Sequence, residues 1–462
     1  MASELIKAVR NLGNLERAWS VIQRNGRASK SEDVRLELEI FAEDAPTNLR
    51  SLKGRLARGS FKFAPAKGVP IPKLDEKGMK TGKFRPIVLA PVESRIVQRA
   101  ILNVLLEVSA LKPFIQTPYS FGGIRGERGP EKDKVSRSDS ISAVPAAIKA
   151  VLDEIGNGAR FVASADISSF FTRISKDAVT KIVAAAVSDD ELVALFRAAI
   201  DVELSNMAQL RDKAVDFPIE DIGVAQGNSL SPLLGNIILA DFDRIMNDGD
   251  CKCVRYIDDF IILAPSKKAA SARLRKASDL LDTLGMKLSP DKTSKGGASI
   301  DDGFDFLGIN VCPGAVRPGA KAQAKILRSV QSAFDESLKM MRGIQHGQPF
   351  DRTGSLSSTL KRVDGMIDGW GKHYWFCNDR QTFDNLDQKI SESIRRYLGE
   401  YSAVRAETAA TSHQRILGIS ELRHIPREPF AYPKLGSRKT RAIPEPKPLA
   451  TSVPSLIRRL DG

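Results

Sequence analysis

The segment Arg255-Tyr-Ile-Asp-Asp-Phe-Ile-Ile-Leu263 places two adjacent carboxylates, Asp258 and Asp259, between apolar, strand-forming residues. Burying two neighbouring acids costs free energy unless a cation neutralises them. A strand over residues 253–257, a tight acidic turn and a returning strand over 260–264 would bring both carboxylates to one sheet edge. This pattern is typical of a divalent metal site. Mg²⁺ is the expected ion because its ligands are hard oxygens.

The dipeptide by itself is weak evidence, because Asp-Asp also occurs at residues 189–190 and 301–302. Those two copies read as ordinary solvated positions, one at a helix start and one in a loop. Only the pair at 258–259 is framed by β-rich apolar segments on both sides. Its interpretation therefore depends on the residues around it.

A third acid, Asp166, follows the short apolar segment 161–165 and precedes two aromatic residues. Two metal ions that hold an attacking and a leaving oxygen need carboxylates that arrive from different strands. Asp166 and Asp258 can supply them, and the carbonyl of Ile167 is a further oxygen. Taken alone, Asp166 could equally cap the turn that follows it.

Between these acids lies a loop with two glycines, residues 223–230, that leads into an apolar helix. Ser231 and Pro232 suit the start of a helix, with the serine as a natural cap. Gly227 lets the backbone approach a ligand closely, and Gln226 can hydrogen-bond to a base or sugar edge. The alternative is a plain junction between a loop and a helix. The acidic strands on either side favour a nucleotide platform.

These blocks, in this order, resemble the reverse transcriptases, especially their bacterial group II intron-like branch. The resemblance covers about residues 50–400 and implies an α+β right-hand polymerase, with fingers and palm built from an antiparallel sheet plus helices and with a helical thumb. The blocks that carry it are Asp166-Ile-Ser-Ser-Phe-Phe171, Gln226-Gly-Asn-Ser-Leu-Ser-Pro232, Tyr256-Ile-Asp-Asp259, Leu284-Gly-Met-Lys-Leu-Ser-Pro-Asp-Lys-Thr293, Gly82-Lys-Phe-Arg-Pro-Ile87, Ser120-Phe-Gly-Gly-Ile-Arg125 and Phe306-Leu-Gly308.

The resemblance implies roles for the acidic residues. Asp166 and Asp258 would hold the metal ions together with the Ile167 carbonyl, and Asp259 would support them. Mg²⁺ is the expected cofactor, with Mn²⁺ as the alternative ion. The chain would then be an RNA-directed DNA polymerase, a nucleotidyltransferase that adds dNMP units from dNTPs.

The resemblance also assigns four residues to the substrate. Phe171 takes the position of the steric gate that clashes with a ribose 2′-hydroxyl, although an aromatic there also suits an ordinary core. Arg85 and Lys73 match the cations that grip the incoming triphosphate, the arginine through bidentate contacts and the lysine as a point charge. Lys292 could protonate the departing pyrophosphate, and a plain surface lysine is the alternative.

The composition of the chain agrees with a polynucleotide partner. The 462 residues carry 70 Lys and Arg against 56 Asp and Glu, a formal net charge of +14. An excess of positive charge is expected of proteins that bind a phosphate backbone. The sequence has no apolar run of membrane-spanning length and no signal-peptide pattern, so we expect a cytoplasmic protein without a membrane. Its four cysteines are too scattered for a zinc ribbon or a disulfide framework.

Four regions follow along the chain. We expect an N-terminal helical extension over 1–60, fingers and palm over 61–315, a helical thumb over 316–400 and a basic, proline-rich arm over 401–462. The fingers hairpin would have its tip at 75–78. Three apolar stripes at helical spacing predict the thumb helices, with Trp370 and Trp375 as core anchors. The arm would lie on RNA or on a neighbouring subunit, with a solvated tail as the alternative.

The subtype rests on analogy within the resembled family. The chain lacks the Val-Thr-Gly signature of retron enzymes and keeps Ser231-Pro232, which diversity-generating enzymes replace. This pattern resembles free-standing, defence-associated bacterial enzymes that copy a noncoding RNA and protect against phage. A group II intron-type enzyme or maturase, or a non-catalytic RNA-binding scaffold, stays open. Expected partners are an RNA template, a DNA primer or product and dNTPs; a homo-oligomer is also open.

Overall fold

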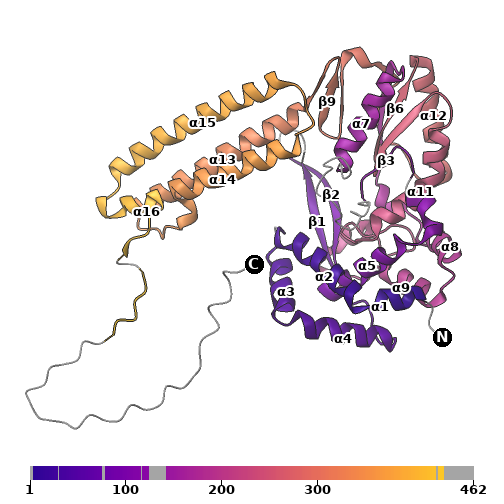
Figure 1. Cartoon of the computed structure of the whole chain (residues 1–462), viewed down its shortest axis with the longest axis horizontal. Coiled ribbons are helices and arrows are strands. Elements are labelled where there is room, and N and C mark those ends of the chain that lie inside the picture. Colours follow the sequence, from indigo (N-terminus) through magenta and orange to yellow (C-terminus); the bar gives the residue numbers. More distant parts are fainter. Residues whose placement is uncertain are drawn as a thin grey trace, which may run out of the picture. The chain divides into compact units, whose positions relative to one another are not determined.

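The computed structural model describes residues 4–29, 31–74, 79–115, 117–123, 142–422 and 425–430. The chain forms two compact units, each treated separately below. The first comprises Met1–Ser332 and Val363–Arg396, and the second comprises Ala333–Arg362 and Tyr397–Gly462. The expected mixed α+β fold is confirmed, since the first unit combines helices with three sheets (Figure 1).

Four helices open the chain, as the sequence predicts for residues 1–60. They pack on one another and on the buried helix α5 (Figure 1). Side chains cap two of them: Asn11 accepts from the Gly13 N–H, and Asp44 accepts from the Thr47 N–H. The five helices are α1 (Glu4–Arg10), α2 (Leu12–Arg27), α3 (Glu32–Glu43), α4 (Ala45–Ala57) and α5 (Val92–Leu105).

The next element is an antiparallel hairpin of two long strands, β1 (Lys67–Leu74) and β2 (Lys80–Leu89). The hairpin predicted for the fingers is therefore present. Its predicted tip, residues 75–78, lies outside the described residues. The pairing is regular from Lys67 to Pro72 and becomes irregular between Pro72 and Leu74.

A five-stranded sheet in the order β3-β5-β6-β4-β7 forms the centre of the first unit. The acidic segment forms the predicted hairpin, because β5 and β6 pair directly and are antiparallel. The strand that ends in Asp166, β4, pairs with the other edge of β6. The strands are β3 (Ser120–Phe121), β4 (Phe161–Asp166), β5 (Lys252–Tyr256), β6 (Asp259–Ala264) and β7 (Ala298–Ser299).

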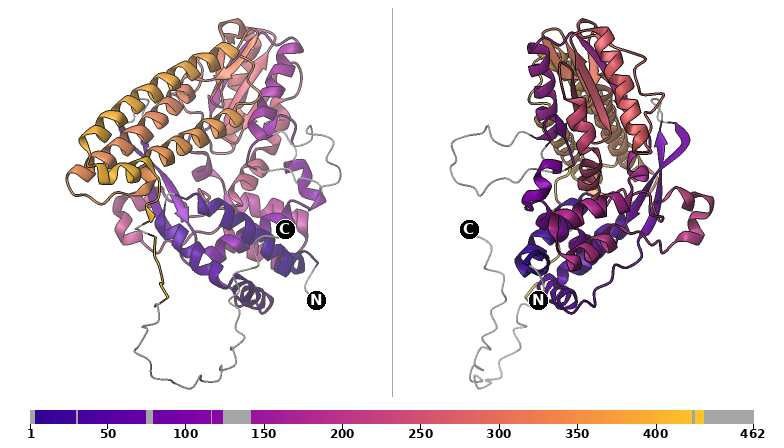
Figure 2. Two further views of the ribbon diagram at one scale, coloured as in Figure 1. Left: turned by 60° about the vertical axis from the view of Figure 1, so that its left-hand side comes forward. Right: turned by 90° about the vertical axis from the view of Figure 1, so that its right-hand side faces the viewer.

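Helices cover both faces of this sheet (Figure 2). On β6, Phe260 and Ile262 face the core shared with α11 (Ser231–Met246) and α12 (Lys267–Thr283). Ile261 and Leu263 face the opposite side, which α7 (Ala143–Gly156) covers. A strand buried on both faces reads as a continuous apolar run, which is the pattern of residues 260–264. Burying each of these large side chains contributes about 1.5–3 kcal/mol.

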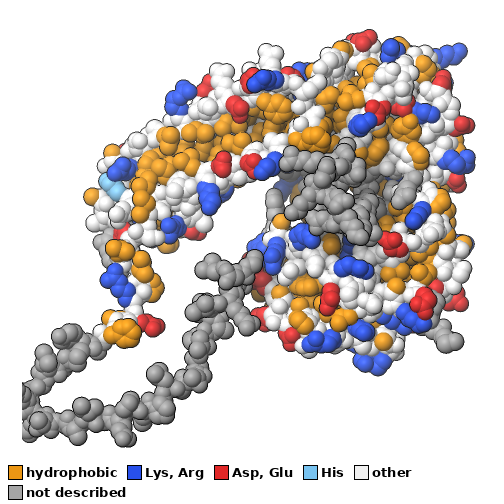
Figure 3. All heavy atoms as spheres, viewed as in Figure 1, with side chains coloured by type: hydrophobic (Ala, Val, Ile, Leu, Met, Phe, Trp, Pro, Cys, Tyr) orange, Lys and Arg blue, Asp and Glu red, His pale blue; other side chains and the backbone are white. Residues whose placement is uncertain are grey.

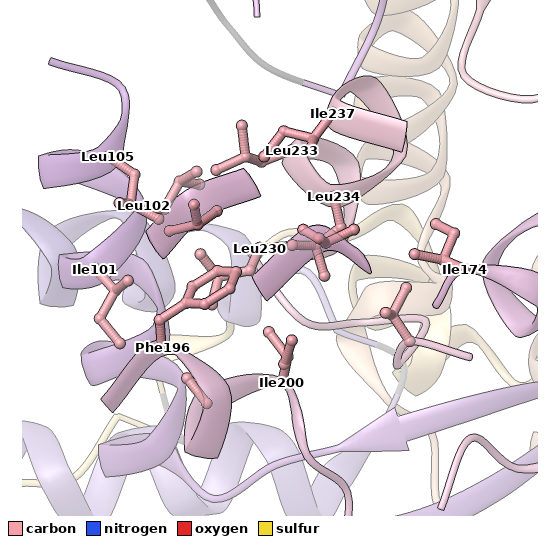
Figure 4. Packing of buried hydrophobic residues seen from close by; sticks show 14 of the residues in the cluster. Ile101, Leu102, Leu105, Ile174, Phe196, Ile200, Leu230, Leu233, Leu234 and Ile237 are labelled. Atoms are coloured by element: carbon pink, nitrogen blue, oxygen red, sulfur yellow. The ribbon is translucent and has the colours of Figure 1, made fainter. Parts of the chain in front are cut away.

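Below the sheet, α5, α9 (Asp190–Ile200) and α11 enclose an apolar core (Figure 4). Figure 4 shows the Phe196 ring of α9 directed toward Leu230, and Ile200 of α9 and Ile101 of α5 belong to the same cluster. These side chains are almost completely excluded from solvent. The core fixes the start of α11 and, with it, the loop that carries Gln226.

A three-stranded sheet follows, formed by β8 (Phe304–Phe306), β9 (Ile309–Cys312) and β10 (Ala315–Pro318). Its first hairpin turns through Leu307 and Gly308, which both have positive φ angles. The Phe306-Leu-Gly308 block therefore forms a tight turn. The short elements of the chain are η1 (Ser109–Leu111), α6 (Lys112–Ile115), η2 (Phe170–Arg173), α8 (Lys176–Val187), α10 (Met207–Leu210), η3 (Arg211–Asp216), η4 (Ile300–Asp302), η5 (Arg352–Gly354), η6 (Ala410–Ser412) and α16 (His413–Leu417).

Three long helices, α13 (Ala320–Gln345), α14 (Leu356–His373) and α15 (Arg380–Glu407), correspond to the three predicted stripes (Figure 2). The C-terminal parts of α13 and α15 and the first part of α14 belong to the second unit. There the Phe334 ring stacks on the Tyr397 ring at a centroid distance of 4.3 Å, and the Tyr397 hydroxyl hydrogen-bonds to Ser337 Oγ at 2.8 Å. No helix in the described parts of the chain is both long and apolar enough to cross a membrane. Most of the predicted basic arm, residues 431–462, lies outside the described residues.

The expectation that Trp370 and Trp375 are both core anchors is half wrong. Trp370 packs against Tyr374 and Phe383, at centroid distances of 4.6 and 6.3 Å. Trp375 is 64% exposed. The helix α14 ends at His373, so Trp375 lies two residues beyond the helix that holds Trp370.

Candidate active site

The three acidic residues meet at one edge of the five-stranded sheet. Tyr256 pairs with Asp259 across the β5–β6 hairpin, so the connecting turn consists only of Ile257 and Asp258. Asp259 also stands directly opposite Asp166, the last residue of β4. Side chains at directly opposite positions of an antiparallel pair have Cβ atoms about 4.5–5.5 Å apart. The fold therefore brings together the acids that the sequence singled out.

The acidic turn is strained and is held from several sides. Ile257 has a φ of 63°, a left-handed conformation that costs a β-branched residue of order 1–3 kcal/mol. The Ile257 N–H donates to the Phe121 carbonyl at 3.3 Å, and the Asp258 carbonyl accepts from the Ile167 N–H at 2.9 Å. The Ile257 carbonyl accepts from Arg255 Nη1 at 2.8 Å. These bonds fix the turn between β3 and the end of β4.

Burial and mutual repulsion disfavour the charged forms of the acids. Burial, then the charges of Asp166 and Asp258, raise the pKa of Asp259 to about 6. Burial and the charge of Asp166 also raise the pKa of Asp258, against smaller opposing effects of Lys292 and Arg85. Such a cluster gains free energy when a cation approaches it.

Among the described residues, Lys292 forms an ion pair with this cluster. Its Nζ donates to Asp166 Oδ1 at 2.8 Å, while the lysine side chain stays 65% exposed. The backbone of its segment is fixed to the acidic strand, because the Asp166 carbonyl accepts from the Ser289 N–H at 2.7 Å. The alternative in which Asp166 caps the following turn is wrong. The carboxylate bonds to Lys292 instead.

The donor atoms at this edge suit a hard divalent ion, although the carboxylates are not arranged as a closed ligand set. No group of three or more His, Cys, Asp or Glu side chains in the described residues is placed to hold a metal ion. The ammonium group of Lys292 lies where it balances the Asp166 charge. In addition, no N–H of the described residues donates to the Ile167 carbonyl.

The two basic residues predicted to bind the triphosphate, Arg85 and Lys73, lie on the β1–β2 hairpin. Arg85 is exposed on β2, and its charge lowers the pKa of Asp258, which places it within electrostatic reach of the acids. Lys73 is exposed at the irregular end of β1, where its carbonyl accepts from Thr81 Oγ1 at 2.9 Å. No interaction of the described residues links Lys73 to the acids. The structure therefore brings Arg85, but not Lys73, to the cluster.

The Gln226–Gly227 loop is fixed against the base of the same hairpin. The Val88 N–H donates to the Gln226 carbonyl at 2.9 Å. Gly227 has a φ of 117°, and a Cβ atom there would lie only 2.7 Å from the Val88 carbonyl oxygen. Only glycine fits this position. The side chain of Gln226 is half-buried and stays available to a ligand.

The start of α11 differs from the expectation by one residue. Leu230 stands at the cap position, and Ser231 is already helical. The Ser231 hydroxyl donates to the Ala225 carbonyl at 2.6 Å, so it stabilises the loop before the helix and does not cap the helix. Pro232 lies in the first turn, as expected.

Phe171 lies between the acidic strand and the glycine loop. It belongs to the short turn η2 directly after β4, and its ring centroid is 5.2 Å from that of the buried Phe170. The Phe171 carbonyl accepts from the Val224 N–H at 2.7 Å, which ties η2 to the loop before Gln226. The ring itself is half-buried. Phe171 is thus packed against the main apolar core without being fully buried in it.

Sequence reasoning missed the buried pair Arg255 and Asp243. Arg255 is completely buried on β5 and forms a bidentate ion pair with Asp243 of α11, Nε to Oδ1 at 2.7 Å and Nη2 to Oδ2 at 2.5 Å. The available signal was an arginine inside an otherwise apolar strand. Asp189 was also misjudged as solvated: it is 5% exposed and accepts from the N–H groups of Leu192 and Ile6.

A cavity of about 350 Å³ is lined in part by residues that neighbour Gln226 in the sequence. Ala225 and Asn228 of the loop, Val88 of β2 and Gln98 of α5 line it. It is largely apolar and contains none of the predicted catalytic residues.

Three comparisons place this geometry among known proteins. The family described as "Reverse transcriptase (RNA-dependent DNA polymerase)" matches residues 71–311, a stretch that contains all of the acids. Protein YkfC of Escherichia coli (strain K12) is 27% identical over 299 residues, which cover 56% of this chain and 70% of that protein.

The solved structures that resemble the chain are more distant. A chain of the "Partial Cas6-RT-Cas1--Cas2 complex" is 19% identical with a TM-score of 0.33, over 60% of this chain and 41% of that one. Apo telomerase from Candida Tropicalis is 11% identical with a TM-score of 0.41, over 77% of this chain and 63% of that one. The chain thus spans only part of each. Both likenesses are weak, and no argument about function rests on them.

Proposed function

The chain belongs to the reverse transcriptase (RNA-dependent DNA polymerase) family, and from that premise we propose that its three acids catalyse RNA-templated addition of dNMP units to a primer. The right-hand polymerase fold follows from the same membership. The observation that carries the proposal is the pairing of Asp166 with Asp259 beside the two-residue turn that holds Asp258. Acids on separate strands at one sheet edge are what a phosphoryl-transfer site requires.

In this proposal Asp166, Asp258 and the Ile167 carbonyl hold two divalent ions, and Asp259 supports them. Mg²⁺ is the proposed ion, with Mn²⁺ as the alternative. When bound, the ions would stabilise the attacking and leaving oxygens of the transfer. The raised pKa values of Asp258 and Asp259 support the assignment, because burial and the neighbouring carboxylates disfavour their charged forms until a cation approaches.

The substrate-binding residues follow from their places around this edge. Arg85 would grip the triphosphate, and Lys73 would join it from the neighbouring strand. Gln226 and Gly227 would contact the nucleotide, and the ring of Phe171 would clash with a ribose 2′-hydroxyl. Two backbone hydrogen bonds support this arrangement. One joins Val224 to Phe171 and the other joins Val88 to Gln226, so the predicted steric gate, the loop and β2 are connected.

Lys292 would have two successive partners. In the structure it neutralises Asp166. Entry of a divalent ion would release the ammonium group, which is largely exposed and attached to a flexible stem. The released lysine could then donate a proton to the departing pyrophosphate.

The proposal extends to the template and to the biological role of the protein. We propose an RNA template, in particular a noncoding RNA that is copied in phage defence in the cytoplasm, with α13–α15 as the thumb and the residues after 400 as an RNA-binding or subunit-binding arm. The net charge of +14 supports a polynucleotide partner. On the face shown in Figure 3, Lys and Arg side chains are interspersed with acids. Loss of phage protection on inactivating the acids would test the setting.

The catalytic proposal is tested with the purified chain, an RNA template, a DNA primer and labelled dNTPs. Asp258→Ala with Asp259→Ala should lower incorporation roughly 10³-fold or more and leave RNA affinity unchanged. The matched control is Asp301→Ala with Asp302→Ala, the same change at an exposed pair in η4, which should retain activity. Incorporation by the 258–259 double variant at the level of the control would refute the assignment.

A further inference from the structure

A buried polar cluster lies directly beneath the acidic turn. At its centre is the guanidinium of Arg255, which is completely buried and bonded through all three nitrogens. Besides the pair with Asp243, its Nη2 donates to Ser120 Oγ at 2.6 Å and to Asn236 Oδ1 at 3.3 Å, and its Nη1 donates to the Ile257 carbonyl at 2.8 Å. One side chain thus connects β3, α11 and the turn.

We propose that Arg255 is a positioning residue that sets the metal affinity of the site by holding the strained backbone of Ile257. This inference rests on the proposed function of the acids. Among the described residues, the side chain of Arg255 reaches the turn through the Ile257 carbonyl and forms no hydrogen bond with Asp258 or Asp259. Its charge is balanced by Asp243, which is 2% exposed. It therefore acts through the backbone and not through its charge.

The turn at Ile257 is strained. A two-residue hairpin with a positive φ at its first position is normally served by glycine or asparagine. Here an isoleucine takes that position with a φ of 63°. A strained conformation persists only where the surroundings enforce it. The Ile257 carbonyl bond to Arg255 is the enforcing contact that reaches the turn from within the core.

The neighbouring block explains how the cluster is kept in place. Ser120 pairs with Arg255 in the parallel β3–β5 ladder, and the Arg255 N–H donates to the Tyr119 carbonyl at 2.8 Å. A Cβ atom at Gly122 would lie 2.9 Å from the Tyr256 ring, so this segment fits closely against the turn. In the 120–125 block, Ser120 thus binds the Arg255 side chain and Gly122 packs against the Tyr256 ring. Residues 124 and 125 lie outside the described residues.

A direct test replaces Arg255 by lysine in the full-length protein. A single ammonium group can still neutralise Asp243 but cannot also supply the Ile257 carbonyl and Ser120, because it lacks the planar fork of arginine. The readout is the Mg²⁺ concentration that gives half of the maximal rise in unfolding temperature. Groups that orient metal ligands contribute about 10–100-fold to affinity, so we expect this concentration to rise about tenfold.

The matched control is Arg273→Lys. Arg273 also donates to several backbone carbonyls, those of Ile245, Met246 and Asp248 at the other end of α11. This variant should lose some stability but keep the wild-type Mg²⁺ midpoint. A wild-type midpoint in folded Arg255→Lys, or an equal shift in both variants, would overturn the proposal. If Arg255→Lys does not fold, Ser120→Ala, which removes one partner of the same guanidinium, should give a smaller shift in the same direction, and an unchanged midpoint there counts against it.

Coupling to the strained residue separates positioning from general stability. Glycine adopts the left-handed conformation without strain. Ile257→Gly should therefore make the Mg²⁺ midpoint less sensitive to Arg255→Lys, whereas independent effects would add. Additive shifts in the double variant would contradict the proposed route. Because the readout is Mg²⁺ binding, a failure here is distinguishable from a failure of the polymerase assignment.

Discussion

Two hairpins carry the charged groups of the site, and they hold them in opposite ways. In the β5–β6 hairpin, the turn with the acids is fixed from the core by Arg255 and from both neighbouring strands. In the β1–β2 hairpin, the side chains of Arg85 and Lys73 are exposed and have no hydrogen bond or ion pair among the described residues. Like charges that must share a cation need to be held against their repulsion. Cations that meet a triphosphate only when it arrives can stay mobile.

The largest effect that would sharpen this contrast is expected at Arg85. Arg85→Ala removes charge-assisted phosphate contacts, so kcat/KM for dNTPs should fall about 100-fold, mainly through KM. The unfolding temperature should stay unchanged, because the exposed side chain has no partner to lose. Steady-state kinetics and thermal unfolding measure both. Lys73→Ala is the control and should have a clearly smaller effect, since nothing in the described structure links Lys73 to the acids.

An Arg85 variant that lost stability and activity together would break the contrast. It would show that Arg85, like Arg255, contributes to the stability of the fold. An unchanged KM would instead exclude Arg85 from the nucleotide site.

Gly227 lies in the loop before α11 and packs closely against Val88 of β2, and this contact gives the second prediction. Gly227→Ala places a Cβ atom 2.7 Å from the Val88 carbonyl oxygen at a φ of 117°, so it should destabilise the protein by about 2 kcal/mol or more. Gly82→Ala is the matched control: its φ is 77°, and nothing lies within 4 Å of the added atom. It should cost only about 1 kcal/mol. Chemical denaturation measures both, and equal costs would show that the loop does not press on β2.

The sequence predicted the acidic hairpin because its signals are local. Two acids between apolar runs indicate both the turn and the strands, and the strands were placed within one residue. The Arg255–Asp243 pair could not be predicted, because its partners lie on different elements that only tertiary packing brings together. Ser231 and Trp375 were misplaced for a different reason. Both lie at a helix boundary, where a shift of one or two residues changes the role of a side chain.

The smallest expected effect concerns protons at the acidic turn. The pKa of Asp259 is about 6 in the folded protein and 3.8 in its ordinary environment. Between these values the unfolded chain has lost the proton while the native state keeps it, so native stability without metal should fall as the pH rises through this window and stay low above pH 6. A divalent ion needs the charged carboxylate, so Mg²⁺ affinity should rise over the same window, by about tenfold per unit below the pKa.

Thermal unfolding with and without Mg²⁺ at pH 5 and pH 7.5 measures both trends. Asp259→Asn should make the Mg²⁺ effect much less dependent on pH, with the remainder due to Asp258, whose pKa is also raised. A Mg²⁺ effect of the same size at both pH values in the unmodified protein would mean that the turn does not bind the ion. The contrast between the fixed acidic turn and the exposed cations of the β1–β2 hairpin would then have no chemical basis.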